Sequence, residues 1–64
     1  LDDTERQVYE ALPARGARTA DEIAVSSGLP VAAVLGSLAM LEIAGLAQRH
    51  EGRWRLVRRP GSIA

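Results

Sequence analysis

Residues 19–46 read TADEIAVSSGLPVAAVLGSLAMLEIAGL, and this stretch decides the fold of the chain. It opens with a capping box, because Glu22 follows Thr19 by three residues, and such a box predicts the start of a helix. Gly28 supplies the left-handed conformation that ends this helix. Pro30 then suits the start of a second helix, since its missing N–H would have no helical partner there.

The spacing inside this stretch is typical of a helix-turn-helix. Ala24 is a small residue that permits close approach of the second helix, and Gly28 stands four positions later, where the chain turns. Flanking apolar residues are expected to close the core, and these are Ile23, Leu29 and Val34. We therefore expect the first helix of the pair to run to about Ser26.

The second helix of the pair is expected from about Val31 to Ala44, with Gly45 following its end. At about 100° per residue, one stripe of this helix faces a single direction. Its members are Val34, Leu38, Leu41 and Gly45, and we expect them to face the core.

The opposite face of this helix is small and uncharged. It comprises Ala32, Ala33, Gly36, Ala39, Met40 and Ile43, with Leu35 at its flank. No Arg or Lys occurs between Pro30 and Gln48, although base readout and phosphate contacts both need polar or cationic donors. Ser37 is the nearest hydroxyl. We predict that this face contacts a protein; the alternative is a solvated face rich in Ala because Ala favours helices.

A further helix is expected before this pair. Asp2 and Glu5 have the spacing of a capping box, and Leu1 is placed to staple the entry. The residues that fall on one face are Val8, Tyr9 and Leu12. Pro13 ends the helix, and residues 14–18 form a connector with room for a short strand.

After Gly45 the pattern changes to that of strands. Residues 46–50 and 53–57 flank a two-residue turn at Glu51 and Gly52. Such a turn pairs Ala47 with Leu56 and Arg49 with Trp54 on one face of a hairpin. The pairs on the other face are then Leu46 with Val57, Gln48 with Arg55, and His50 with Arg53.

Three helices followed by a hairpin predict a small, mainly α winged helix-turn-helix of the α+β class, in which the hairpin is the wing. We expect the domain to cover residues 1–58 and a flexible tail to cover residues 59–64. Trp54 is expected to act as a lid that holds the hairpin on the helices. The alternative role for Trp54 is stacking on an unpaired base.

The net charge of zero conceals an uneven distribution. The residues before 46 include seven acidic residues and three arginines, which gives a net charge of −4. The residues from 46 onward include five arginines and Glu51, which gives a net charge of +4. These five are Arg49, Arg53, Arg55, Arg58 and Arg59. We predict that they contact DNA phosphates without sequence preference. The alternative is a solvated strand face that pairs with the acidic helices.

The composition argues against several other functions. The chain of 64 residues has no Cys, and His50 has no second His to share a metal, so neither a disulfide nor a zinc site is expected. Asp21 and Glu22 are explained by helix capping, so we expect no enzyme activity and no cofactor. No apolar run approaches the ~20 residues of a membrane span. We expect a soluble cytoplasmic module that belongs to a longer protein.

The residues from Thr19 to Leu56 resemble the C-terminal winged-helix domain of the DprA (Smf) family of DNA-processing proteins. The resemblance is carried by DEIA at 21–24, GLPV at 28–31, LAMLEIAGL at 38–46 and GRWRL at 52–56. It implies an accessory domain in a protein of natural transformation, whose Rossmann-like domain binds single-stranded DNA, dimerises and helps load the RecA recombinase. The rival interpretation is a sequence-specific transcription regulator with the same fold.

Overall fold

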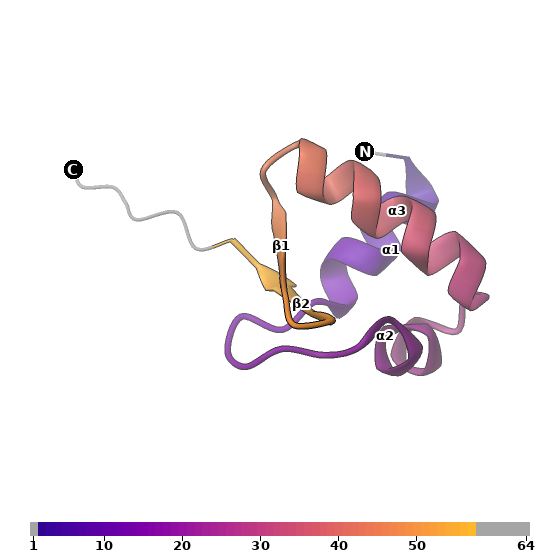
Figure 1. Ribbon diagram of the computed structural model, residues 1–64. Helices are drawn as coiled ribbons and strands as arrows, with labels where there is room; N and C mark the ends of the chain where they lie inside the picture. Colours follow the sequence, from indigo (N-terminus) through magenta and orange to yellow (C-terminus); the bar gives the residue numbers. More distant parts are fainter. Residues whose placement is uncertain (1, 58–64) are drawn as a thin grey trace.

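The computed structural model describes residues 2–57, which form three helices followed by a two-stranded antiparallel sheet (Figure 1). The helices are α1 (Asp3–Ala11), α2 (Ala20–Ser27) and α3 (Val31–Ile43), and the strands are β1 (Ala47–His50) and β2 (Arg53–Leu56). The expected winged helix-turn-helix is confirmed, with each element bounded within a few residues of its expected range. The staple at Leu1, the arginines at 58 and 59, and the tail to residue 64 lie outside the described residues.

Both predicted capping boxes are present. At the start of α1, the Glu5 N–H donates to Asp2 Oδ1 at 2.7 Å and the Asp2 N–H donates to Glu5 Oε1 at 3.2 Å. At the start of α2, the Glu22 N–H donates to Thr19 Oγ1 at 3.1 Å and the Thr19 N–H donates to Glu22 Oε1 at 2.9 Å. These bonds satisfy N–H groups that would otherwise have no helical partner.

The turn between α2 and α3 has the expected chemistry. Gly28 adopts φ 77° and its N–H donates to the Ala24 carbonyl at 2.9 Å, which closes α2. A side chain is rarely tolerated at such a φ, so this position favours glycine. Pro30 is the N-cap of α3 rather than its first helical residue. The two helices meet at 111°, within the range of a helix-turn-helix.

One core holds the helices and the hairpin together, with α3 packed against α1, α2 and β1. Its buried apolar side chains come from all the elements and are Val8, Leu12, Ile23, Val34, Leu38, Leu41, Ala47 and Trp54. Burial of this apolar surface is the main force that fixes the arrangement of the elements, because helices this short are marginal in isolation.

One expectation for α3 is wrong. Gly45 is exposed rather than part of the core stripe, because α3 ends at Ile43 and Gly45 turns away with φ 79°. Ser37, the hydroxyl residue nearest to the outer face, is buried, with 6% of its surface exposed. It stands three residues after Val34 and four before Leu41, and that spacing places it within the buried stripe.

The hairpin has the predicted register. Ala47 pairs with Leu56, Gln48 with Arg55, Arg49 with Trp54, and His50 with Arg53. The two turn residues, Glu51 and Gly52, both have positive φ, at 54° and 79°, as the tight hairpin turns that match strand twist require. Beyond the strands, the Val57 N–H donates to the Leu46 carbonyl at 3.1 Å.

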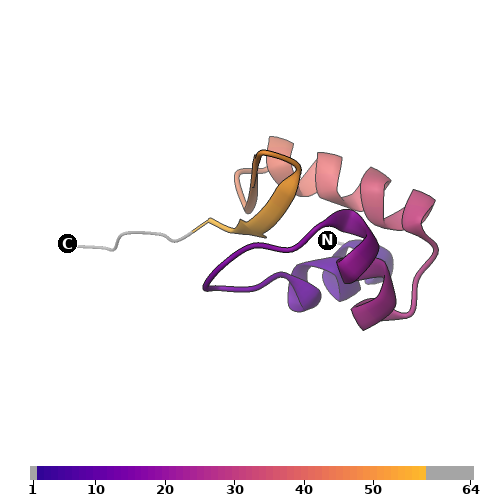
Figure 2. The same cartoon turned by 60° about the horizontal axis from the view of Figure 1, so that its bottom comes forward.

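The connector between α1 and α2 runs beside β2 (Figure 2). The Arg18 N–H donates to the Trp54 carbonyl at 3.0 Å, and the Trp54 N–H donates to the Arg18 carbonyl at 2.7 Å. A second contact follows where the Leu56 N–H donates to the Pro13 carbonyl at 3.1 Å. In place of a short strand, residues 14–18 contribute a single antiparallel bridge to Trp54. The bridge lies on the edge of β2 that faces away from β1.

Within residues 2–57, no single helix is long and apolar enough to cross a membrane. The pair α2 and α3 reaches that length and composition only when both are taken together across their bend.

Candidate nucleic-acid interface

The wing arginines divide between two faces of the hairpin. Arg53 and Arg55 flank Trp54 in β2, so they point away from the core while Trp54 points into it. Arg49 is the partner of Trp54 in β1, and its guanidinium lies over the indole at 5.5 Å from the ring centroid. Arg58 and Arg59, the other two predicted arginines, lie outside the described residues.

Trp54 is the lid that the sequence predicts. Only 6% of its surface is exposed, and it belongs to the same core cluster as Leu38 and Leu41 of α3. Arg49 covers it from the side of β1 with a cation–π contact. An unpaired base could stack on this indole only after the hairpin had left the core, so base stacking is not a role for Trp54 in this fold.

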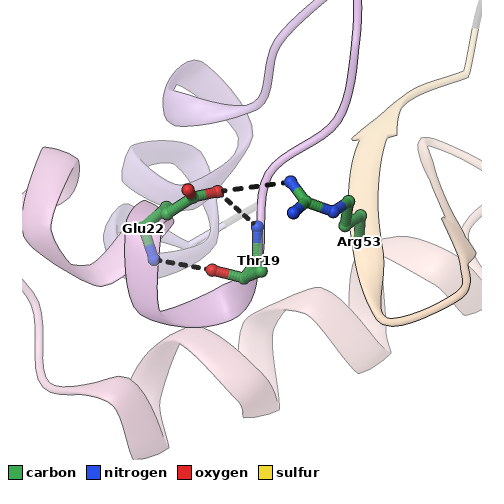
Figure 3. A network of polar contacts seen from close by, with 3 residues as sticks. All are labelled: Thr19, Glu22 and Arg53. Atoms are coloured by element: carbon green, nitrogen blue, oxygen red, sulfur yellow. Dashed lines mark hydrogen bonds and ion pairs between the residues drawn. The ribbon is translucent and has the colours of Figure 1, made fainter.

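Arg53 contacts the acidic start of α2. Its Nη1 lies 3.9 Å from Glu22 Oε1, the same oxygen that accepts the N–H of Thr19 (Figure 3). Both charged side chains are 55% exposed. A pair this long and this solvated contributes little stability and is weakened by salt. Arg53 therefore lies on the outer face of the wing, the face that points away from the core. The Glu22 carboxylate of α2 holds it there only loosely.

Arg55 is held by an uncharged partner instead. With the Gln48 amide oxygen turned toward it, that oxygen accepts hydrogen bonds from Arg55 Nε at 2.8 Å and Nη2 at 2.9 Å. This amide orientation is the one that satisfies both groups. Gln48 carries no charge, so it orients the guanidinium of Arg55 without offsetting its positive charge.

Two hollows lie between the outer face of the wing and the connector. The first has a volume of about 330 Å³ and is lined by Gly16, Ala17, Gln48, His50, Glu51, Arg53 and Arg55. The second has a volume of about 500 Å³ and is lined by Ala14, Arg15, Gly16, Gln48, Arg55, Leu56 and Val57. Three residues line both hollows, so the two are adjacent. They gather basic side chains from two separate parts of the chain.

Arg15 is the residue that the sequence reasoning missed. It belongs to the connector, 40 positions before Arg55, yet both line the second hollow. The sequence signal for Arg15 is the possible short strand in residues 14–18, because such a strand would pair with the free edge of the wing. His50, also in the first hollow, is a solvated side chain 84% exposed and lies 3.9 Å from Glu51.

The outer face of α3 is largely as the sequence predicts. Among its large apolar side chains, Met40 is 53% exposed and Ile43 is 80% exposed, and Leu35 at its flank is 50% exposed. Ala33 differs, because it is half-buried at the edge of this face. No side chain of the described residues would meet a Cβ added at Gly36. The face carries no cation.

Comparison with known proteins bears on this arrangement. The family model of the DprA winged helix domain matches residues 1–53 of the chain. The chain belongs to the DprA winged-helix family. Within the DprA family, two relatives from Mycobacterium tuberculosis, strains CDC 1551 / Oshkosh and ATCC 25618 / H37Rv, are each named “Putative DNA processing protein DprA”. Each is 67% identical over 58 residues, which cover 91% of this chain and 15% of the relative.

The resemblance seen in the sequence is thereby confirmed, and the domain is a module of the DNA-processing DprA type. The chain spans about 15% of the length of the curated DprA relatives it matches. The DprA family match also covers the connector, including Arg15, and extends to Arg53 in the wing.

Proposed function

We propose that this domain is a non-catalytic accessory module of a DprA-like DNA-processing protein. It contacts a protein through the outer face of α3 and holds DNA weakly, without sequence preference, through the outer face of the wing. The distribution of charge carries this proposal. The helix α3, which reads bases in many helix-turn-helix proteins, has no cation, whereas Arg53 and Arg55 stand together on the wing. The parent protein acts in the cytoplasm, in natural transformation and recombination.

Sequence-specific recognition is disfavoured by the chemistry of α3. Reading a base pair in the major groove takes side chains such as Arg, Asn or Gln at the groove-facing positions. The corresponding positions here carry Ala32, Gly36 and Ala39, which have no donor or acceptor to offer. The one hydroxyl of the helix, on Ser37, is buried. A regulator that used this fold in the usual way would have nothing with which to read bases.

Nonspecific contact with phosphates is supported by the wing. Arg53 is held only by the loose contact with Glu22 at 3.9 Å, and a phosphate forms shorter, charge-assisted bonds to guanidinium. The positive charge of Arg55 is not offset by its partner, because Gln48 is neutral. Arg53 can therefore turn to a phosphate at small cost, and Arg55 offers a phosphate the N–H donors that Gln48 does not use. Such contacts are independent of base sequence.

A protein contact is supported by the exposed part of α3. Met40 and Ile43 expose more than half of their surfaces, and apolar side chains gathered on an uncharged helix face are typical of interaction sites. The partner that fits the family is the remainder of the parent chain or the RecA recombinase that the parent helps to load. The α3 face and the wing's outer face then perform separate tasks.

The test is a titration of the domain with random duplexes, with duplexes selected for binding, and with single strands, each at two salt concentrations. We expect weak binding that falls steeply with salt and differs little between sequences. Discrimination of about 10³-fold or more between sequences would be the behaviour of a specific regulator, and it would overturn the proposal in favour of that rival function.

A further inference from the structure

We propose that the two adjacent hollows between the connector and the wing act together as one cleft for the phosphate backbone of duplex DNA. Arg15 and Arg55 contact phosphates in it, and Gln48 acts as a positioning residue for Arg55. This inference rests on the proposed function, since it assumes that the outer face of the wing meets DNA. It adds a part of the chain outside the wing, the connector, to that interface.

The shape of the surface supports a cleft rather than isolated charges. Gly16, Gln48 and Arg55 line both hollows, so Arg55 stands at their junction. Arg53 lines the first hollow and Arg15 the second. The cleft therefore presents a row of cations with Arg55 in the middle, and a row of cations matches the regular row of phosphates along one DNA strand.

Arg55 is prepared for an anion by its contact with Gln48. The guanidinium has five N–H donors in a fixed fork, and the bonds from Nε and Nη2 to the Gln48 oxygen use two of them. The remaining donors stay free for phosphate oxygens. Because the guanidinium is already held in one orientation, less side-chain entropy is lost when the phosphate binds.

Arg15 is brought to the cleft by a connector that is fastened to the wing. The bridge between Arg18 and Trp54 and the bond from Leu56 to Pro13 hold the connector at both ends. Between these points, Ala14, Arg15 and Gly16 form the rim of the second hollow. A positive charge on a tethered loop adds a phosphate contact at a fixed place relative to Arg55.

Duplex DNA is the occupant that this surface favours. Proteins that hold single strands add stacking of bases on aromatic side chains, which supplies much of their affinity. The aromatic residues of the chain are Tyr9, which packs against the core from α1, and the buried Trp54. Neither lines the cleft. A surface with cations and neither Trp nor Tyr gains most from the higher and more regular charge density of a duplex.

Among residues 2–57, Glu51 is the one carboxylate that lines the cleft. It lies in the hairpin turn, 3.9 Å from His50 Nε2, and its side chain is 83% exposed. A negative charge at the rim repels phosphate. We therefore expect Glu51→Gln to strengthen binding of the duplex about twofold to threefold at low salt and to have a smaller effect at high salt.

The experiment measures binding of a 20-base-pair duplex and of one of its strands by fluorescence anisotropy at several salt concentrations. The variants are Arg15→Ala, Arg55→Ala and Gln48→Ala, with Arg6→Ala of α1 as the matched control, since Arg6 does not line the cleft. Circular dichroism melts establish that each variant is folded. The duplex is expected to bind more tightly than the strand.

Arg15→Ala and Arg55→Ala should each weaken duplex binding roughly tenfold and reduce the slope of log affinity against log salt by about 0.9. Gln48→Ala should weaken binding a few fold while leaving that slope unchanged, because it removes no charge. Arg6→Ala should leave both quantities unchanged.

Tighter binding of the single strand than of the duplex, or equal effects of Arg15→Ala and Arg6→Ala, would overturn the cleft. Failure of the cleft is distinguishable from failure of the proposed function. If only the cleft is wrong, Arg53→Ala and Arg55→Ala still weaken binding and flatten the salt slope. If the proposed function is wrong, no variant of the wing changes the binding of any DNA.

Discussion

Arg18 and Trp54 exchange two backbone hydrogen bonds, of 3.0 and 2.7 Å, although they stand 36 positions apart in the sequence. Through this bridge the connector lies along the free edge of β2, like a third strand of the wing. The indole of Trp54 meanwhile enters the helical core. The bridge and the indole act on the same residue of β2. Together they fix the position of the hairpin, and with it the orientation of the arginines on either side of Trp54.

Removal of the Trp54 indole should detach the wing. We expect Trp54→Ala to lower the free energy of unfolding by about 3–5 kcal/mol, which is most of the stability of a domain this small. Trp54→Phe should cost less because it fills more of the site. The check is urea denaturation followed by circular dichroism, with Arg55→Ala as the neighbouring control. A loss below about 1 kcal/mol in Trp54→Ala would contradict the lid role.

The capping box of α2 should contribute measurably to stability. Thr19→Ala removes the acceptor for the Glu22 N–H and should cost about 1 kcal/mol, whereas Thr19→Ser keeps it. Glu22→Gln keeps an oxygen for the Thr19 N–H but removes the charge that faces Arg53. Since that ion pair is long and solvated, we expect this change to cost less than about 0.5 kcal/mol. Thermal melts of the three variants at two salt concentrations separate the cap from the ion pair.

Gly36 and Gly28 should respond in opposite directions to alanine. Neither has a neighbour within 4 Å of an added Cβ, but Gly36 is helical whereas Gly28 has φ 77°. Gly36→Ala should therefore stabilise the domain by about 0.5–1 kcal/mol, and Gly28→Ala should destabilise it by about 1 kcal/mol. Denaturant midpoints measure both. If Gly36→Ala were destabilising, α3 would not be the regular exposed helix that the structure has at this position.

The outer face of α3 can be tested without disturbing the core. Ala39→Arg and Met40→Glu place charges on exposed positions, so we expect stability to change by less than about 0.5 kcal/mol while binding to the partner is lost. Pull-downs use the rest of the parent protein and RecA. Val25→Glu on α2, where Val25 is 85% exposed, is the control for an added charge elsewhere. Undiminished capture by both α3 variants would mean that this face is merely solvated.

The faces of the wing should differ in their effect on DNA. Arg53→Ala combined with Arg55→Ala should flatten the salt dependence of binding by about two phosphate contacts, or about 1.8 in slope. Arg49→Ala removes the same kind of charge from the opposite face, where Arg49 lies over Trp54, and should leave that slope unchanged. Equal effects of the double variant and Arg49→Ala would show that only the overall charge matters.

Much of this fold follows from patterns that extend over a few residues. The two capping boxes, the turn at Gly28 and the hairpin register depend on groups within about four positions of one another, where the backbone itself sets the distances. The alternation of side chains along the strands separates Arg49 from Arg53 and Arg55. The helical period identifies Val34, Leu38 and Leu41 as core residues. It fails at Gly45 because the period applies only while the chain remains helical.

The candidate site required the tertiary structure. That Arg15 shares a hollow with Arg55, that Glu22 faces Arg53, and that the connector forms an edge of the wing all depend on how α1 and the hairpin pack across the core. No local period relates residues 40 positions apart. Which elements form, and which face of each is apolar, could be predicted from the local sequence, because these follow from short-range sterics and hydrogen bonding. The cleft between connector and wing was decided by long-range packing, since burial of Trp54 is what brings its two sides together.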